Sequence, residues 1–144
     1  MPVILAEFQN HVAVSIAAME QQRVLCEAAQ PDHRALAHGR WQLAKIGRRR
    51  MQFLIEQVMP LAERHAGTSG GAALLALRGS WPAFGKTISA FLARWPAEAI
   101  AANWEGYRRE AASFRHEITQ RLHQEEEGLR DMLAEIEHRA AAAA

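Results

Sequence analysis

Apolar side chains recur at intervals of three, four or seven residues through most of the chain, and helices are the structures that this spacing favours. One stripe, between Val3 and Ala29, consists of Leu5, Phe8, Val12, Met19 and Cys26. A second runs through Leu36, Leu43, Gly47, Leu54, Val58 and Leu61 toward His65, and a third through Tyr107, Ala111, Phe114, Ile118, Leu122, Leu129, Met132 and Ile136. Since residues at these intervals share one side of a helix, the sequence predicts long amphipathic helices.

Glycine, proline and short polar residues mark where these helices begin and end. Pro31 ends the first helix, Asp32 caps the second, and the glycine-rich run at 66–71 predicts a loop. A third helix is expected from 72 to 95, broken or kinked where glycine, serine and proline interrupt it at 79–82. A short helix at 97–102 and a cap at Asn103 precede the last long helix, which is expected to reach about His138.

These elements predict an all-α fold, an antiparallel up-down four-helix bundle with its third helix broken or kinked. Ala, Leu, Glu, Arg and Gln dominate the composition, and they are residues that lose little side-chain entropy in a helix. A chain of 144 residues matches one domain over 1–144, with a frayed tail at 139–144. Few other arrangements bury three or four such stripes, and a dimeric helical hairpin is the alternative.

Charge and cysteine usage narrow the expected surroundings of the protein. The lone Cys26 cannot form an internal disulfide, and no basic, apolar leader opens the sequence, so a cytoplasmic protein without a membrane segment is expected. The formal net charge is only +1. Lys45, Arg48 and Arg49 could face phosphates, but the overall basicity that typifies nucleic-acid binding is missing, so no nucleic-acid partner is expected.

Two charged residues fall among the apolar stripes. Arg50 projects to the same side as Leu43 and Leu54 on the second helix, and Glu125 to the same side as Ile118 and Met132 on the last. A buried guanidinium requires a partner, and a carboxylate is the best one, which predicts an Arg50–Glu125 ion pair in the core. The alternative is that both side chains reach water from the edges of their stripes.

The seven histidines raise the question of a metal site. Only His11 and His65 lie close enough to a stripe to face inward, whereas the others project outward or lie at helix ends; these are His33, His38, His116, His123 and His138. No inward H-E-x-x-H or E-x-x-H pair occurs, so no complete dinuclear site is expected. On the outer face of the last helix, the ladder His116, Gln120, His123 and Glu127 predicts at most an adventitious zinc or nickel site.

Four short motifs resemble the hemerythrin-like (HHE) family of four-helix bundles. They are Arg40-Trp41 in the second helix, Pro60 near its end, Ala93-Arg94-Trp95-Pro96 at the end of the third, and RLHQEEEGL from Arg121 to Leu129. The resemblance spans about Leu5 to Leu133. It implies the bundle topology and, in members of that family, two irons held by histidines and carboxylates.

The residues at the implied ligand positions depart from that pattern on every helix but the first. His11 matches the first-helix histidine, whereas Arg50 and Leu54 occupy the second-helix positions of a histidine and a glutamate. The histidine pair of the third helix is absent. On the last helix Arg121 takes the histidine position, and Glu125 or Glu126 keeps a carboxylate. The resemblance therefore implies a bundle that has lost its metal centre, with the Arg50–Glu125 pair in its place.

The expected function is a non-catalytic binding, sensing or protein-interaction module without a cofactor. Its partner would be another protein, a small apolar ligand or a second copy of the chain, and Trp41, near the edge of its stripe, could serve an interface. The alternative is a residual iron or oxygen response using His11, His65, Glu125 and Glu126. Catalysis is not expected, because Cys26 has no histidine at helical contact spacing, and neither a G-x-S-x-G motif nor a phosphate-cradling glycine loop occurs.

Overall fold

The computed structural model describes residues 2–144, and every regular element in that range is helical. In chain order the elements are α1 (Pro2–Leu25), α2 (His33–Phe53), the π-helical turn η1 (Leu54–Val58), α3 (Met59–Arg64), α4 (Ser69–Gly79), α5 (Trp81–Arg94), α6 (Ala97–Ala102) and α7 (Trp104–Ala143). The prediction of an all-α protein is therefore confirmed.

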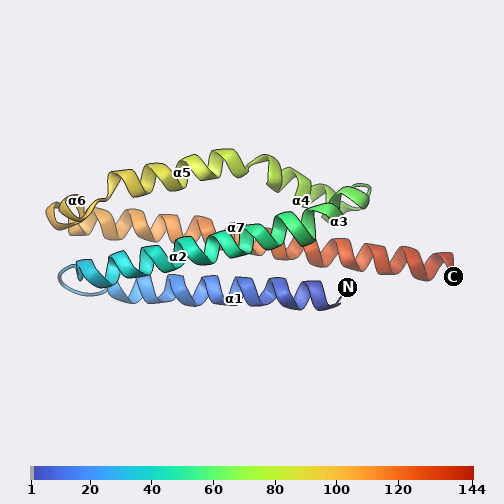
Figure 1. The fold of residues 1–144 in the computed structure, drawn as a ribbon, viewed down its shortest axis with the longest axis horizontal. Helices are drawn as coiled ribbons and strands as arrows, with labels where there is room; N and C mark the ends of the chain where they lie inside the picture. Colours follow the sequence, from blue (N-terminus) through green and yellow to red (C-terminus); the bar gives the residue numbers. More distant parts are fainter. Residues whose placement is uncertain (1) are drawn as a thin grey trace.

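The helices run alongside one another in an elongated molecule (Figure 1). α1 leads away from the N-terminus, α2 and α3 return along it, α4 and α5 lead back again, and α7 spans the whole length. α1 packs against both α2 and α7, and α4 packs against both α3 and α7. Figure 1 shows α5 arching away from the other helices before α6 turns the chain into α7.

Side-chain caps begin three of these helices. The carboxylate of Asp32 accepts from the backbone N–H of residue 35, and the side chain of Asn103 accepts from the N–H of residue 106, so both predicted caps are confirmed. Thr68 likewise accepts from the N–H of Gly71 and starts α4 at Ser69. The loop is therefore shorter than the predicted 66–71, because the helix that Thr68 caps already includes Gly70 and Gly71.

The second long helix stays continuous to Arg64 despite Pro60, through the π-helical turn η1. Proline lacks an N–H and its ring crowds the carbonyl one turn earlier, which breaks or kinks an ordinary α-helix. Here the N–H of Met59 bonds to the carbonyl of Leu54, five residues back. This wider turn directly precedes the proline, and it follows the segment that carries Arg50.

The predicted break in the third helix lies at Ser80, between α4 and α5. The Ser80 hydroxyl donates to the carbonyl of Leu77 at 2.7 Å and accepts from the Arg121 guanidinium of α7 at 3.0 Å. Arg121 also lies over the ring of Phe84, 4.2 Å from its centroid. Arg121 of α7 therefore contacts both the break and the first turn of α5.

Two clusters of buried side chains form the core. The Leu129 cluster lies toward the N-terminus of α1 and the middle of α7, and includes Phe8, Val12, Met19, Leu54, Val58, Leu74, Leu122, Leu129 and Met132. The Tyr107 cluster lies at the opposite end of α1 and comprises Cys26, Leu36, Phe91, Trp95, Ile100, Tyr107 and Ala111. In the Tyr107 cluster, Phe91 stacks on Phe114 at 4.5 Å and Trp95 meets Tyr107 edge-on at 5.5 Å, so large rings join α5 to α7.

The last helix extends to Ala143 and thus includes the segment 139–144 that the sequence predicts to be frayed, apart from its final residue. Every residue in that segment is exposed, so packing does not hold it. Alanine has the highest intrinsic helix propensity, which explains the continuation. Among residues 2–144, no helix combines the length and apolarity that crossing a membrane requires.

Candidate functional site

The centre of the molecule holds one buried ion pair between α2 and α7. The Arg50 guanidinium donates a hydrogen bond from Nη1 to Oε1 of Glu125. The exposed fraction is 10% for the Arg50 side chain and 2% for that of Glu125, so neither side chain reaches far into water. The structure therefore brings together the two charged residues that the sequence singles out on the apolar stripes.

Burial and charge act in opposite directions on this pair. Burial raises the pKa of Glu125 above its usual range, and the nearby Arg50 guanidinium partly opposes that shift, with a smaller contribution from Arg121. On the α1 side, His11 is half-buried and its ring lies 5.0 Å from that of Phe53. Burial and then the charge of Arg50 lower the pKa of His11. The charge of Arg50 therefore favours the ionised form of Glu125 and the neutral form of His11.

The four residues of the metal-binding alternative do not gather into one site. Within residues 2–144, no group of three or more His, Cys, Asp or Glu side chains could hold a metal ion. His65 forms the C-terminal cap of α3, and Glu126 pairs with Arg130 of its own helix at 3.3 Å. The sequence prediction that the other five histidines face outward is confirmed, because all of them are exposed.

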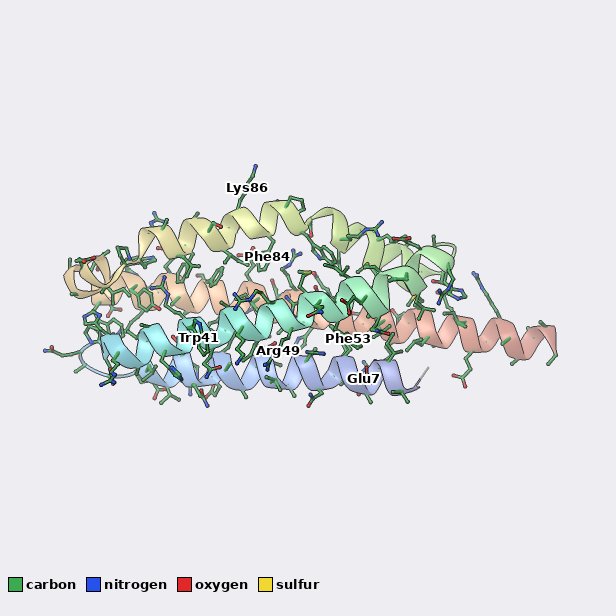
Figure 2. All side chains as sticks on the ribbon, in the orientation of Figure 1. Glu7, Trp41, Arg49, Phe53, Phe84 and Lys86 are labelled. Carbon is green, nitrogen blue, oxygen red and sulfur yellow. The ribbon has the colours of Figure 1, made fainter. Side chains whose placement is uncertain are left out.

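A cavity of about 380 Å³ lies beside the ion pair, among α1, α2, α5 and α7. It occupies the junction of the two core clusters, since its lining includes Met19 and Leu122 of the first and Phe91 and Tyr107 of the second. Apolar side chains form most of its wall. In Figure 2, Phe84 points from α5 toward the other helices and into this region, whereas Lys86 points away.

The cavity opens to solvent between α2 and α5. The lining residues that are exposed are Ala44 and Arg48 on α2 and Leu92 on α5. Gly47, on the same edge of α2, also lines the cavity, and a Cβ added there would meet no atom within 4 Å. The backbone at Gly47 therefore borders open space on this edge of the cavity.

The charged lining residues all carry the same sign. They are Arg40, Arg48, Arg50 and Arg115, with no acidic residue among the lining side chains of the described chain. Arg40 donates to the backbone carbonyls of Trp95 at 2.7 Å and Leu92 at 3.4 Å, and Arg50 is paired with Glu125. The guanidinium of the half-buried Arg115 forms one hydrogen bond with residues 2–144, a long one of 3.8 Å to the sulfur of Cys26.

Two buried polar groups lie in the same lining. Gln22 is 5% exposed and Tyr107 2% exposed, and no side-chain hydrogen bond joins the Gln22 amide or the Tyr107 hydroxyl to the described residues. Solvent still reaches these polar atoms, because Trp81 Nε1 is the one side-chain N or O atom among the described residues that is fully buried without a hydrogen-bond partner. The Gln22 side chain packs against α2 at Gly39. A Cβ added to Gly39 would come within 1.5 Å of the amide nitrogen of Gln22. Burial raises the pKa of Tyr107, against the opposing charges of Arg40 and Arg115.

Reasoning from the sequence missed the cavity and its polar residues, although part of their signal was present. Gln22 lies three residues after Met19 and four before Cys26, and is thus a polar member of the first stripe. Arg115 lies four residues after Ala111 and three before Ile118, on the last stripe. These positions match the signal that singled out Arg50 and Glu125.

Neither a protein-family model nor a curated protein nor a solved structure matches the chain.

Proposed function

We propose that this protein is a non-catalytic binding module, a hemerythrin-like four-helix bundle without its di-iron site, that takes a small, largely apolar ligand into the cavity between α1, α2, α5 and α7. The observation that carries the proposal is that cavity: about 380 Å³, mostly apolar, and open to solvent at one side. Small-molecule sites in proteins typically have a volume of this order, with apolar walls and a few polar groups that fix orientation.

The ion pair supports the loss of the metal centre. By the family resemblance, Arg50 stands at a ligand position on the second helix, and Glu125 or Glu126 at the carboxylate position on the last. A guanidinium is a permanent cation with no acceptor atom, so it repels a metal ion rather than ligating it. The contact between Arg50 and Glu125 also engages the carboxylate that a metal would need.

The state of the candidate nucleophiles supports a binding role over catalysis. Ser15 lines the cavity, but its hydroxyl donates to the carbonyl of His11 one turn earlier, at 2.8 Å. Cys26 is buried, and its sulfur contacts an arginine rather than a base. A nucleophile requires a neighbouring base or another source of activation together with access to its substrate. Holding a ligand needs only the cavity and its lining.

We expect the neutral apolar dye N-phenyl-1-naphthylamine to bind the protein with one-to-one stoichiometry and enhanced fluorescence. A Gly47→Phe variant should weaken this binding by about tenfold or more, because a ring at the opening competes with the dye for the same space. A fluorescence titration of wild type and variant measures both effects.

The matched control is Gly85→Phe. Gly85 is an exposed position within α5 where an added Cβ would also meet no atom within 4 Å, but it does not line the cavity. Both substitutions place phenylalanine in a helix interior, so only the cavity distinguishes them. If the dye does not bind wild type, or if both variants bind as wild type does, the cavity is not a ligand site.

A further inference from the structure

We infer that the ligand of this cavity is an amphipathic monoanion, an unbranched carboxylate whose head group meets Arg115, Gln22 and Tyr107 and whose apolar tail extends toward Phe84. This inference rests on the proposed function, since it names the chemical class that the same cavity selects. It follows from the charge of the lining and from the polar side chains that line the cavity without a hydrogen bond to the described residues.

The charge of the lining selects an anion. Its four charged side chains are arginines, and Arg115 is the one among them that is half-buried and has no carboxylate or carbonyl partner among residues 2–144. Glu20 is the acidic residue of α1 whose pKa responds to Arg115. Both of its oxygens accept from Arg23, at 2.6 and 2.9 Å, and neither accepts a hydrogen bond from Arg115. The Arg115 guanidinium therefore retains donors for a ligand, and a carboxylate matches their geometry.

Two neutral polar residues of the lining lie on segments that also carry Arg115 or its contact. Arg115 contacts the sulfur of Cys26, one helical turn from Gln22 on α1. Tyr107 precedes Arg115 by about two turns on α7, and the charge of Arg115 acts on its hydroxyl. A polar group that loses water when a ligand enters needs a hydrogen bond from that ligand in its place. A carboxylate accepts from a guanidinium, an amide N–H and a hydroxyl alike, so one head group satisfies all three.

The rest of the cavity suits an apolar tail. Beyond these groups most of the wall consists of apolar side chains such as Leu43, Met51, Phe84, Ile88 and Ile118. Of the polar residues there, Arg50 is neutralised by Glu125, the Ser15 hydroxyl is bonded to a backbone carbonyl, and Arg48 is exposed at the opening. A ligand charged at both ends, or polar throughout, would leave groups unpaired against this wall. The arrangement favours a single charge at one end.

Three ligands of equal chain length test the inference by calorimetric titration at pH 7.5: decanoate, decanol and decyltrimethylammonium. Decanoate should bind at least about tenfold more tightly than decanol, the gain expected from one charge-assisted hydrogen bond, and the cation should bind most weakly. Equal affinities for decanoate and decanol would overturn the inference and leave the cavity as an apolar site. No binding of any of the three would overturn the proposed function as well.

Variants at Arg115 identify the residue that meets the head group. Arg115→Gln should lower the affinity for decanoate by about tenfold and leave that for decanol unchanged, whereas Arg115→Lys, which keeps the charge, should retain most of the preference. Arg109→Gln is the matched control, an exposed arginine on the same helix outside the cavity. A decanoate preference that survives in a folded Arg115→Gln protein would contradict the assignment. If circular dichroism shows that variant unfolded, the lysine variant and the three-ligand comparison decide.

Discussion

Replacement of Arg50 by methionine is expected to destabilise the protein by about 3–5 kcal/mol, the usual effect of breaking a buried ion pair from one side. The substitution leaves the Glu125 carboxylate in the interior at 2% exposure without its hydrogen-bond donor. Methionine is close in volume to arginine, so a cavity contributes little to the loss. Urea unfolding followed by circular dichroism measures the change in the free energy of unfolding.

The loss should depend on pH in a defined direction. Burial already raises the pKa of Glu125, and removal of Arg50 takes away the main influence that opposes this shift. A carboxyl whose folded pKa lies above its unfolded value carries no penalty while both states are protonated. The penalty grows as the pH rises from the unfolded toward the folded pKa. The free energy of unfolding of the Arg50→Met protein should therefore lie further below that of wild type at pH 8 than at pH 5.

A double variant distinguishes the contribution of the two charges to stability from that of side-chain packing. Arg50→Met with Glu125→Met removes both charges, and exchange of a buried pair for apolar side chains of similar volume is often neutral or stabilising. We expect the double variant to recover most of the stability that each single variant loses. Additive losses would mean that the two residues act independently, which would contradict the pairing.

Gly70→Ala is the second substitution with a large expected effect, a loss of about 3 kcal/mol or more. Gly70 lies in α4 where it crosses α7, and an added Cβ would come within 2.2 Å of the backbone nitrogen of Met132 and 2.4 Å of the carbonyl oxygen of Gly128. Backbone atoms in the middle of a long helix cannot yield as a flexible side chain does. The two helices would have to separate, which would expose the Leu129 cluster.

A graded series of glycines provides the controls, again by urea unfolding. At Gly128 an added Cβ would crowd the flexible side chain of Leu74, at 3.0 Å, and would meet the Gly70 carbonyl oxygen at an ordinary 3.5 Å, so Gly128→Ala should destabilise less than Gly70→Ala. Gly85→Ala should stabilise the protein by about 0.5–1 kcal/mol, because its surroundings are open and alanine favours the helix. Equal effects at the three positions would contradict the close crossing of α4 and α7.

The sequence predicted the helices well because their signals are local. Asp32 and Asn103 act on N–H groups three residues away, and the break at Ser80 follows from glycine and proline nearby. The early start of α4 was missed, since Gly70 in a glycine-rich run indicates a loop until α7 is known to lie against it. The π-helical turn before Pro60 was missed because stripes are counted with the period of an ordinary α-helix.

The candidate site divides in the same way. A charge on an apolar stripe is visible in one helix, so Arg50 and Glu125 could be identified, and their opposite signs predicted the contact. The cavity depends instead on the distance between α5 and the other helices. Large rings that stack between α5 and α7, such as Phe91 and Phe114, hold the helices at that distance. No pattern along a single helix encodes that distance. Gln22 and Arg115 can be recognised as site residues only once the cavity beside them is known.

The central claim is that an ion pair, rather than a metal, occupies the polar centre of the helices beside a ligand cavity. A crystal structure with anomalous diffraction recorded above the iron edge, from protein expressed with added iron and crystallised with decanoate, tests it most directly. The account predicts Arg50 hydrogen-bonded to Glu125, no anomalous peak between the helices, and a carboxylate density beside Arg115. An iron peak ligated by Glu125, His11 and a further side chain would contradict it.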